Sequence, residues 1–289
     1  VPTGYKRLNT ADLAAPTVTD PRAHFAIALY TGTAQSKTVR SCFDSTGTAW
    51  TPDLVWIKGR SNAGEGVLVD SVRGAANVLT PDHTPVEFHD IKSVASLIEG
   101  GFTLGAGDDR NDSNDNAKTY VAWCLKAGTA WSESAQNSNI LASSGRKSDT
   151  AKFSIASWTH RTSGNYAIKH NLGTTPEFFI TKARDEALNW SSWHKDFADT
   201  AKRVWINDTV AESVAYWADA SDSADGTGSY ADISSGESPV TSTLFAIQDG
   251  EATGARAMIA YFFARTPGLI GIGTYTGNTT TGSLPYVVV

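Results

Sequence analysis

The stretch Thr51-Pro52-Asp53-Leu54-Val55-Trp56-Ile57-Lys58-Gly59-Arg60 decides the fold, because it occurs twice in the chain. It returns as Thr175-Pro176-Glu177-Phe178-Phe179-Ile180-Thr181-Lys182-Ala183-Arg184. In both copies a Thr-Pro-acid turn precedes four mostly apolar residues, and a Lys, a small residue and an Arg follow. An apolar run of this length after a turn signal is typical of a β-strand. The sequence therefore predicts two copies of one β-rich unit.

Two further markers flank this stretch in both copies, and the upstream marker occurs a third time near the C-terminus. The upstream marker spans Phe25–Gly32, Phe153–His160 and Ile270–Gly277, and the downstream pair spans Phe102–Gly105 with Tyr120–Cys124 and Phe245–Gln248 with Met258–Phe262. Three markers in the same order and at comparable spacing indicate a duplicated structural unit.

The repeat predicts how the chain is divided. We expect an extended lead-in at 1–22, a first unit at 23–128, a linker at 129–151, a second unit at 152–268 and a partial third repeat at 269–289. Two strands cannot bury an apolar face by themselves. We therefore expect the partial repeat to pair with a sheet edge of this chain or of a neighbouring subunit.

The composition agrees with an all-β fold. The chain has 289 residues, of which 40% are apolar and 10% aromatic, and it is rich in Ser, Thr and Gly. This apolar content can fill a core, and many short strands joined by polar turns fit the residue types. The exception is Ile91–Glu99, whose apolar residues at positions 91, 94, 95 and 98 predict a helix of about two turns.

Charge and length patterns exclude several classes of partner. The formal net charge is −6, and no dense basic run is present, so we expect no nucleic-acid binding. No apolar run approaches the ~18 residues of a membrane span, and Val1–Gly4 shows no start of a secretory signal. Two cysteines do not make a disulfide framework, so we expect Cys42 and Cys124 to be free thiols that act as small packing residues.

The loop at 108–116 (Asp-Asp-Arg-Asn-Asp-Ser-Asn-Asp-Asn) is the densest polar cluster and has two interpretations. Carboxylate and amide oxygens are the ligands that Ca²⁺ prefers; the candidate ligands are Asp108, Asp112, Asn114 and Asn116. The match to a calcium loop then fails, because Ala117 replaces the glycine and Trp123 stands in place of the bidentate acid. Asp and Asn are also common turn formers. We favour a solvated strand connection and expect no cofactor.

Tryptophan is the most informative residue type after the repeat. Three tryptophans lie inside strand patterns and are expected in the core: Trp56, Trp123 and Trp158. Four others crowd the second unit among Ser, Asn and Asp: Trp190, Trp193, Trp205 and Trp217. Exposed Trp side chains stack on sugar rings and anchor interfaces. The second group therefore has three interpretations: ordinary packing, glycan binding or subunit contact.

A pair of basic residues recurs at the same place in each unit. The residues are Lys58 and Arg60 in the first copy and Lys182 and Arg184 in the second. A repeated charged pair could bind an acidic ligand, or it could form structural ion pairs with acids of a neighbouring strand. We favour the structural interpretation.

No residue pattern indicates catalysis. The six His occur without a Gly-x-Ser-x-Gly elbow, a His-Glu-x-x-His helix or a Cys-His signature. A pair of carboxylates placed for glycoside hydrolysis stays a possibility, because the spacing of such a pair is set by the fold and not by the sequence. We expect no enzymatic activity, and a polysaccharide depolymerase is the weakest alternative.

The motifs resemble a family of repeated-domain virion proteins of tailed bacteriophages, common among marine and cyanobacterial phages. The matching segments are Tyr30–Thr33, Thr51–Arg60, Asp70–Gly74, Gly101–Gly105 and Tyr120–Gly128. The resemblance covers most of the chain. Leu125 replaces a Trp of the family pattern, and the second unit is diverged, with His160 at the position of the turn glycine.

The resemblance implies tandem concanavalin-like or jelly-roll β-sandwich units in a structural protein of the virion. Such a protein is a tail fibre, a spike or a head decoration at the surface of the extracellular particle. The resemblance implies that the chain binds other virion proteins and also further copies of itself, as a homo-oligomer such as a trimer. It carries over no catalytic residues. A carbohydrate-binding adhesin that contacts a host-surface glycan is the alternative, and a tail fibre can combine both roles.

Overall fold

The computed structural model describes residues 16–107, 110–136, 140–161, 164–214, 217–218, 220, 236–248 and 255–274. Short β-strands form nearly all of its regular structure, together with a 3-10 turn at Pro21–Ala23 (η2). None of these described residues belongs to a helix long and apolar enough to cross a membrane. The all-β prediction is confirmed.

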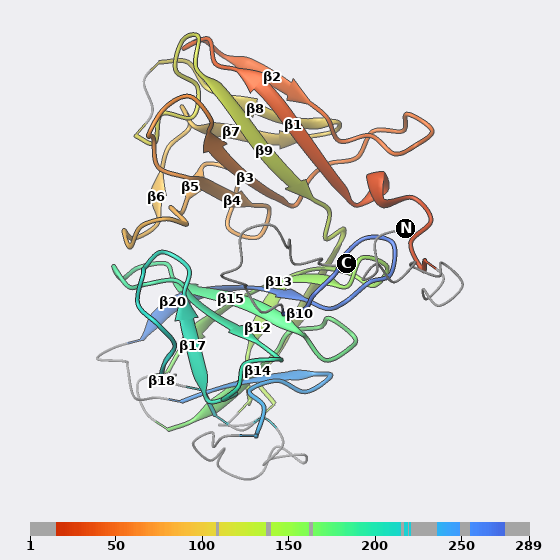
Figure 1. Cartoon of the computed structure of the whole chain (residues 1–289), viewed down its shortest axis with the longest axis vertical. Helices are drawn as coiled ribbons and strands as arrows, with labels where there is room; N and C mark the ends of the chain where they lie inside the picture. The colour runs from red at the N-terminus through yellow and green to blue at the C-terminus, as the bar shows by residue number, and fades with distance from the viewer. Residues whose placement is uncertain are drawn as a thin grey trace, which may run out of the picture.

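The strands fall into two sets of sheets, which we call the first lobe (β1 to β9) and the second lobe (β10 to β20). The first lobe contains β1 (Phe25–Thr31), β2 (Lys37–Arg40), β3 (Leu54–Gly59), β4 (Val67–Asp70), β5 (Asn77–Val78), β6 (Phe88–His89), β7 (Val94–Ile98), β8 (Gly101–Leu104) and β9 (Thr119–Leu125). The second lobe contains β10 (Thr129–Glu133), β11 (Ile140–Leu141), β12 (Ser143–Ser148), β13 (Phe153–His160), β14 (Tyr166–Lys169), β15 (Phe178–Ala183), β16 (Ser191–His194), β17 (Lys202–Trp205), β18 (Ser213–Val214), β19 (Leu244–Ile247) and β20 (Arg256–Phe263). Figure 1 shows the lobes one above the other.

The first lobe is a sandwich of two antiparallel sheets. One sheet has the strand order β1-β9-β3-β4 and the other has the order β2-β8-β7. Alternate side chains of each sheet point inward, and Val55, Ile57 and Phe102 meet in the shared core. Cys42 and Cys124 are buried free thiols in the same core.

The second lobe repeats this arrangement with additional strands. Its large sheet has the order β10-β12-β13-β20-β15-β16-β17-β18, and it faces the sheet β11-β14-β19. The core between these sheets is aromatic, with Phe179, Phe245 and Phe262 in mutual contact at ring-centroid distances of 4.7 to 5.6 Å. The aromatic content of the sequence is therefore concentrated where two sheets must be held together.

The repeated sequence forms the same four-strand order twice, because β13-β20-β15-β16 corresponds to β1-β9-β3-β4. The cross-strand registers also correspond. In the first lobe Trp123 lies opposite Ile27 on one side and Trp56 on the other. The concanavalin-like class and the unit boundaries stay predictions.

Two segments differ from the sequence expectations. The helix predicted at 91–99 is wrong, because Val94–Ile98 is strand β7, which pairs with β8 and carries a register shift between Val94 and Ser96. That shift breaks the alternation of a regular strand and produces an apolar spacing that a short helix would also show. The segment 129–151, predicted as a linker, contains β10, β11 and β12.

The partial third repeat lies mostly outside the described residues, which end at 274. Within them, Thr266 and Ile270 form an isolated bridge. The backbone N–H groups of Thr17 and Val18 both donate to the carbonyl of Pro267, at 2.9 and 3.1 Å. The pairing predicted for 269–289 therefore stays a prediction.

Candidate functional site

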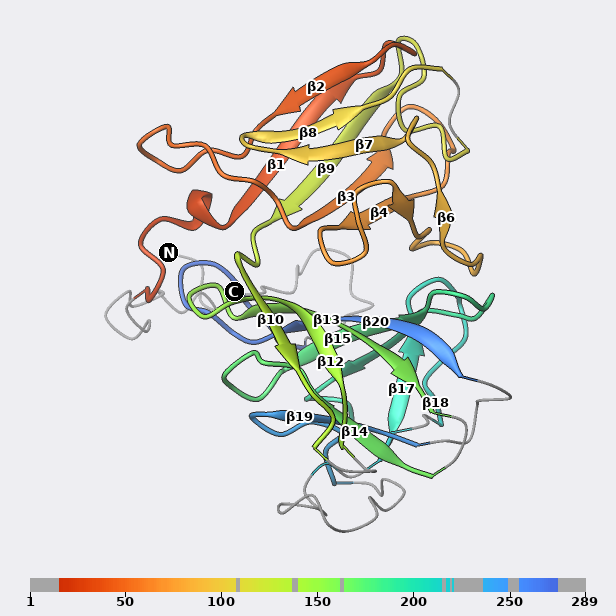
Figure 2. The ribbon, with the colours of Figure 1, turned by 180° about the vertical axis from the view of Figure 1, so that it is seen from behind.

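An apolar seam joins the two lobes. The outer face of β13-β20-β15 packs on the outer face of β3 and β4, and Figure 2 shows these two sheets facing each other. Ile155 and Tyr261 of the second lobe are fully buried against Leu54 and Leu68 of the first. The sandwich cores are thus joined by a third core between the lobes.

A buried polar network crosses the same seam. The Nε of Arg73 lies 2.6 Å from the carboxylate of Asp70, which also accepts a 2.6 Å hydrogen bond from the hydroxyl of Tyr261. Glu87 accepts from Arg73 at 2.8 Å and from Arg184 at 2.7 and 3.0 Å. Burial raises the pKa of Glu87, but the hydrogen bonds from Arg184 and Arg73 outweigh it and hold the pKa below its ordinary value. Asp70, Arg73 and Glu87 belong to one lobe, and Arg184 and Tyr261 to the other.

The four repeated basic residues have different surroundings. Lys58 forms an ion pair with Asp82 at 2.5 Å, and Arg184 joins the seam through Glu87. Arg60 is exposed. These positions fit the structural interpretation for Lys58 and Arg184. Lys182 is buried, and its ammonium donates to backbone carbonyls rather than to a carboxylate.

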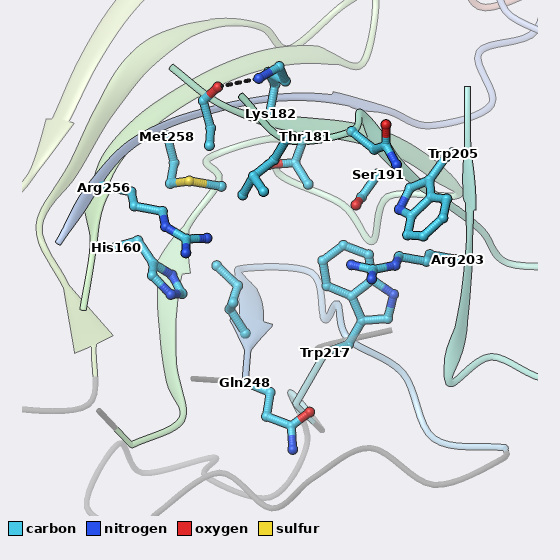
Figure 3. A pocket seen from close by; sticks show the side chains of 14 residues that line it. His160, Thr181, Lys182, Ser191, Arg203, Trp205, Trp217, Gln248, Arg256 and Met258 are labelled. Atoms are coloured by element: carbon cyan, nitrogen blue, oxygen red, sulfur yellow. Dashed lines mark hydrogen bonds between the residues drawn. The ribbon is translucent and has the colours of Figure 1, made fainter. Parts of the chain in front are cut away.

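Lys182 belongs to a pocket that sequence reasoning did not find. The cavity has a volume of about 140 Å³ and lies on the large sheet of the second lobe. Its lining includes the three cations Lys182, Arg203 and Arg256 and the aromatic residues Trp205 and Trp217, and we call it the basic pocket. Figure 3 shows His160 and Arg256 on one side and Arg203 with Trp205 on the other. The missed signal was an arginine inside each of two strands, β17 and β20.

The charges of the basic pocket are held by specific contacts. The guanidinium of Arg203 lies over the ring of Trp205, 5.0 Å from its centroid. Arg256 forms a 2.5 Å ion pair with Glu186. Burial lowers the pKa of Lys182 to about 8, against the opposing effect of Asp185 and Glu186. The three basic side chains are therefore held in place by contacts within the protein.

Of the three interpretations of the second tryptophan group, ordinary packing fits the surroundings of three of its four residues. Trp190 and Trp193 are buried, and their indole nitrogens donate to the carbonyls of Thr80 and Thr200 at 2.8 and 3.0 Å. Trp217 is buried against Phe179. They are buried because the sheet β11-β14-β19 or the first lobe covers them, which polar neighbours in sequence do not reveal. Trp205 alone is half-buried.

Of the three tryptophans expected in the core, Trp158 is buried. Trp56 and Trp123 are only partly buried and lie edge to face on the outer surface of the first lobe, 5.9 Å apart.

The loop of the calcium hypothesis is held by its own amide groups. Asn114 is buried, and its carbonyl oxygen accepts from the Thr33 N–H at 3.1 Å while its amide donates to the carbonyls of Gln35 and Gly105. Asp112 and Asn116 are exposed, and Asp108 lies outside the described residues. No group of three or more His, Cys, Asp or Glu side chains placed to hold a metal occurs in the described part of the chain. The expectation of a solvated strand connection without a cofactor stays a prediction.

An apolar patch lies on the outer face of β1, the edge strand of the first lobe's large sheet. Ile27 is 54% exposed and Leu29 is 65% exposed. Both point to the same side as Trp123, which lies opposite Ile27 in the register. The corresponding residues of the second lobe, Ile155 and Tyr261, are the ones buried in the seam.

Comparison with known proteins adds one finding. The search of curated proteins and the search of solved structures found no match. A family model does match, over residues 20–288. The chain therefore belongs to the family described as Domain of unknown function (DUF7483).

Proposed function

We propose that this chain is a non-enzymatic structural protein of a tailed-phage virion, of tail-fibre, spike or head-decoration type, which works by assembly. The motif resemblance supports the virion, and its segments lie within or directly beside strands β1, β3, β4, β8 and β9 of the first lobe. The observation that carries assembly is the uncovered apolar row on the large sheet of the first lobe, formed by Ile27, Leu29 and Trp123.

The second lobe indicates what such a row does. Ile155 and Tyr261 correspond to Ile27 and Trp123, and both are buried against the first lobe, whereas the counterpart of Leu29 is the half-buried Ser157. Full burial of a large aliphatic side chain contributes about 1.5–3 kcal/mol relative to exposure. The second lobe gains this energy within the chain, whereas Ile27 and Leu29 leave it unused.

The occupant we propose is a second copy of this chain. In the seam, the matching sheet face of the second lobe packs on the surface of the first lobe, so a lobe of another copy on the face of β1 would repeat a mode of packing that occurs within the chain. In addition, β1 pairs only with β9 among the described strands, and an edge strand offers backbone groups for pairing between subunits. Repetition of the contact on a symmetric particle would add many weak contacts into strong attachment.

The test is the oligomeric state of the full chain, measured by size-exclusion chromatography with light scattering over a range of concentrations. We expect an oligomer for the wild-type chain and a monomer for the Ile27→Thr/Leu29→Thr variant, since Thr keeps strand propensity while it removes apolar surface. Ile91→Thr is the matched control, because Ile91 is 61% exposed and lies outside the strands. It should remain oligomeric. A wild-type chain that is monomeric at every concentration, or a double variant that still assembles, overturns assembly through this face.

The place in the virion has its own test. Antibodies against the purified chain should label phage particles produced from the genome that encodes it, and the chain should be present among the proteins of purified particles. Absence of the chain from intact purified particles would contradict the virion proposal whatever its oligomeric state.

A further inference from the structure

The outer edge of β1 is occupied in one lobe and open in the other. Within the part of the chain that the structure describes, β1 pairs with β9 on one side and with no strand on the other. The equivalent edge of the second lobe belongs to β13, and there β12 pairs antiparallel from Phe153 to Trp158. The repeated sheet therefore accepts an added antiparallel strand at this position, and the first lobe offers the same position unfilled.

Alternate residues of β1 direct their backbone groups toward the open edge. In an antiparallel pair, residues that exchange hydrogen bonds with the partner strand alternate with residues that do not. Just before β1, the carbonyl of His24 accepts from the Lys126 N–H at 2.9 Å. Just after it, the Gly32 N–H donates to the carbonyl of Lys118 at 2.8 Å, and the register with β9 is continuous in between. The even-numbered residues therefore bond to β9, and the odd-numbered residues from 25 to 31 direct their N–H and C=O groups to the open edge.

The sequence of β1 contains none of the features that usually protect an edge strand. Natural edges are short, carry a charge or a proline, or contain a bulge. β1 has seven residues, Phe-Ala-Ile-Ala-Leu-Tyr-Thr, with neither charge nor proline, and its register with β9 is regular. In contrast, the edge strand β2 has four residues that include Lys37 and Arg40, and the edge strand β7 carries a register shift. The open edge of β1 is therefore suited to pairing with another strand.

A second copy of β1 fits this edge best in one antiparallel register. When Ala28 of one copy lies opposite Ala28 of the other, all seven residues of β1 are paired, whereas any shift leaves residues unpaired at both ends. In this register Ile27 lies opposite Leu29 of the second copy. Their side chains, 54% and 65% exposed in the single chain, then form apolar cross-strand pairs. No like charges meet, because β1 carries no charge.

We propose that β1 pairs antiparallel with β1 of a second copy of this chain, about a two-fold axis at Ala28, so that the large sheets of the two first lobes join into one. The inference rests on the proposed function for its partner. It goes further because it assigns the contact to the backbone edge of β1 and states its symmetry. A two-fold contact uses the same patch on both copies and closes on itself, so this contact yields a dimer.

The first experiment is a disulfide crosslink at the two-fold axis. Ala28 would face its copy in a pair that exchanges no hydrogen bonds, where Cα atoms are about 4.5 Å apart, and a disulfide spans about 4.4–6.8 Å between Cα atoms. We expect Ala28→Cys to give a covalent dimer after mild oxidation with diamide, visible on a non-reducing gel and lost with dithiothreitol. The wild-type chain should give none, because Cys42 and Cys124 are buried.

Ala26→Cys is the matched control for the crosslink. Its two copies would lie about 14 Å apart along the strands, beyond the reach of a disulfide, so it should stay monomeric on the gel. Absence of the Ala28→Cys dimer while the wild-type chain is oligomeric, or equal crosslinking of Ala26→Cys, overturns the proposed register.

The second experiment separates the edge of β1 from its apolar face. Ile27→Pro removes an N–H that points to the open edge, and proline is tolerated at an edge position whose N–H faces solvent, so the pairing with β9 is kept. Because the two-fold axis removes the hydrogen bond twice, we expect the dissociation constant of the dimer to rise by about tenfold or more. Ile27→Val is the matched control, since it keeps the N–H and an apolar side chain, and it should assemble like the wild type. Light scattering over a range of concentrations measures both.

The outcomes distinguish this inference from the proposed function. A wild-type chain that is monomeric at every concentration contradicts both. A wild-type oligomer in which Ile27→Pro, shown to be folded by its thermal melt, assembles as tightly as Ile27→Val overturns the edge pairing alone and leaves assembly through the outer face of β1 standing. If Ile27→Pro does not fold, the Ala28→Cys crosslink decides.

Discussion

The two lobes use the same repeated lysine for different purposes. Lys58 in the first lobe is partly exposed and reaches the carboxylate of Asp82 at 2.5 Å. Lys182 in the second lobe is buried and donates to the carbonyls of Ala183 and Glu186 at 2.8 and 3.0 Å. One position of the repeat thus makes a surface ion pair in one copy and leaves a cation beside a pocket in the other. Surroundings rather than residue type decide the role.

The outer sheet faces differ in the same way. The row around Tyr261 is covered by the first lobe, whereas in the matching row Trp123 is partly buried and its neighbour Ile27 is exposed. The two lobes therefore present matching sheet faces, and the seam covers only one of them completely. Substitutions at the seam, inside the second lobe and at the Lys58 ion pair can each test how the stability of one lobe differs from, or depends on, that of the other.

The largest effect is expected at the seam. Arg73→Met should lower the free energy of unfolding by about 3–5 kcal/mol, because it leaves the carboxylate of Asp70 buried without a compensating cation. Urea unfolding followed by tryptophan fluorescence measures this loss. We also expect the transition to separate into two steps, since Arg73 links Asp70 to Glu87 and, through it, to Arg184 of the second lobe.

The control for the seam is Arg60→Met, which removes an exposed arginine from the same lobe. Surface changes of this kind are usually within about 0.5 kcal/mol. If Arg73→Met lost no more stability than Arg60→Met, the buried network would not be what couples the lobes.

The next largest effect is a dependence of stability on pH that arises in the second lobe. His170 is fully buried in the second lobe; its Nδ1 accepts from the Leu172 N–H and its Nε2–H donates to the carbonyl of Thr241. Burial lowers the pKa of His170 to about 4, from an ordinary value of 6.5. Between these values the unfolded chain binds the proton and the folded chain does not, so stability falls as pH falls from 6.5 to 4. The loss should reach about 3 kcal/mol below pH 4.

Urea unfolding at pH 7, 5.5 and 4.5 measures this slope, and His170→Asn is the informative variant. The Asn side-chain oxygen can accept from the Leu172 N–H but does not titrate. The part of the slope that belongs to His170 should disappear in the variant. An unchanged pH dependence would show that acid destabilisation arises elsewhere, in carboxylates such as Glu87, whose lowered pKa has the same sign of effect.

Sequence patterns predicted the strands that lie in the repeat and failed where distant parts of the chain decide. Strands β3 and β15 follow directly from the Thr-Pro-acid signal and the apolar run behind it. The neighbours of Trp190 in sequence are Asn and Ser and do not decide between burial and exposure, yet its indole N–H donates to Thr80, 110 residues away in the other lobe. No local pattern contains that contact. The sequence left the role of Trp190 open for a physical reason: the covering surface belongs to the first lobe.

The basic pocket was missed for a related reason. Arg203 and Arg256 lie in different strands, 53 positions apart by their residue numbers. Only the insertion of β17 next to β16 brings Arg203 to the face where β20 carries Arg256. The repeat marked Lys182, but its partner charges come from segments outside the repeated motifs. The available signal was Arg256, the charged first residue of the otherwise apolar strand β20.

The smallest effect is expected at the surface ion pair of the first lobe. Burial raises the pKa of Asp82, but hydrogen bonds from Lys58 and from the Gly66 N–H outweigh it and hold the pKa below its ordinary value. Asp82→Asn keeps an oxygen for Gly66 and removes only the charge attraction. Both side chains are more than a third exposed, so solvent screens the pair and the loss should be about 0–1 kcal/mol. The loss should shrink further in 1 M salt, where the Debye length is about 3 Å. Urea unfolding of the wild type and the variant at low and high salt measures the loss of stability and its dependence on salt. A loss above about 2 kcal/mol that salt does not reduce would mean that Lys58, like Lys182, depends on a buried environment. The two copies of the repeat would then differ less than the surroundings of their lysines indicate.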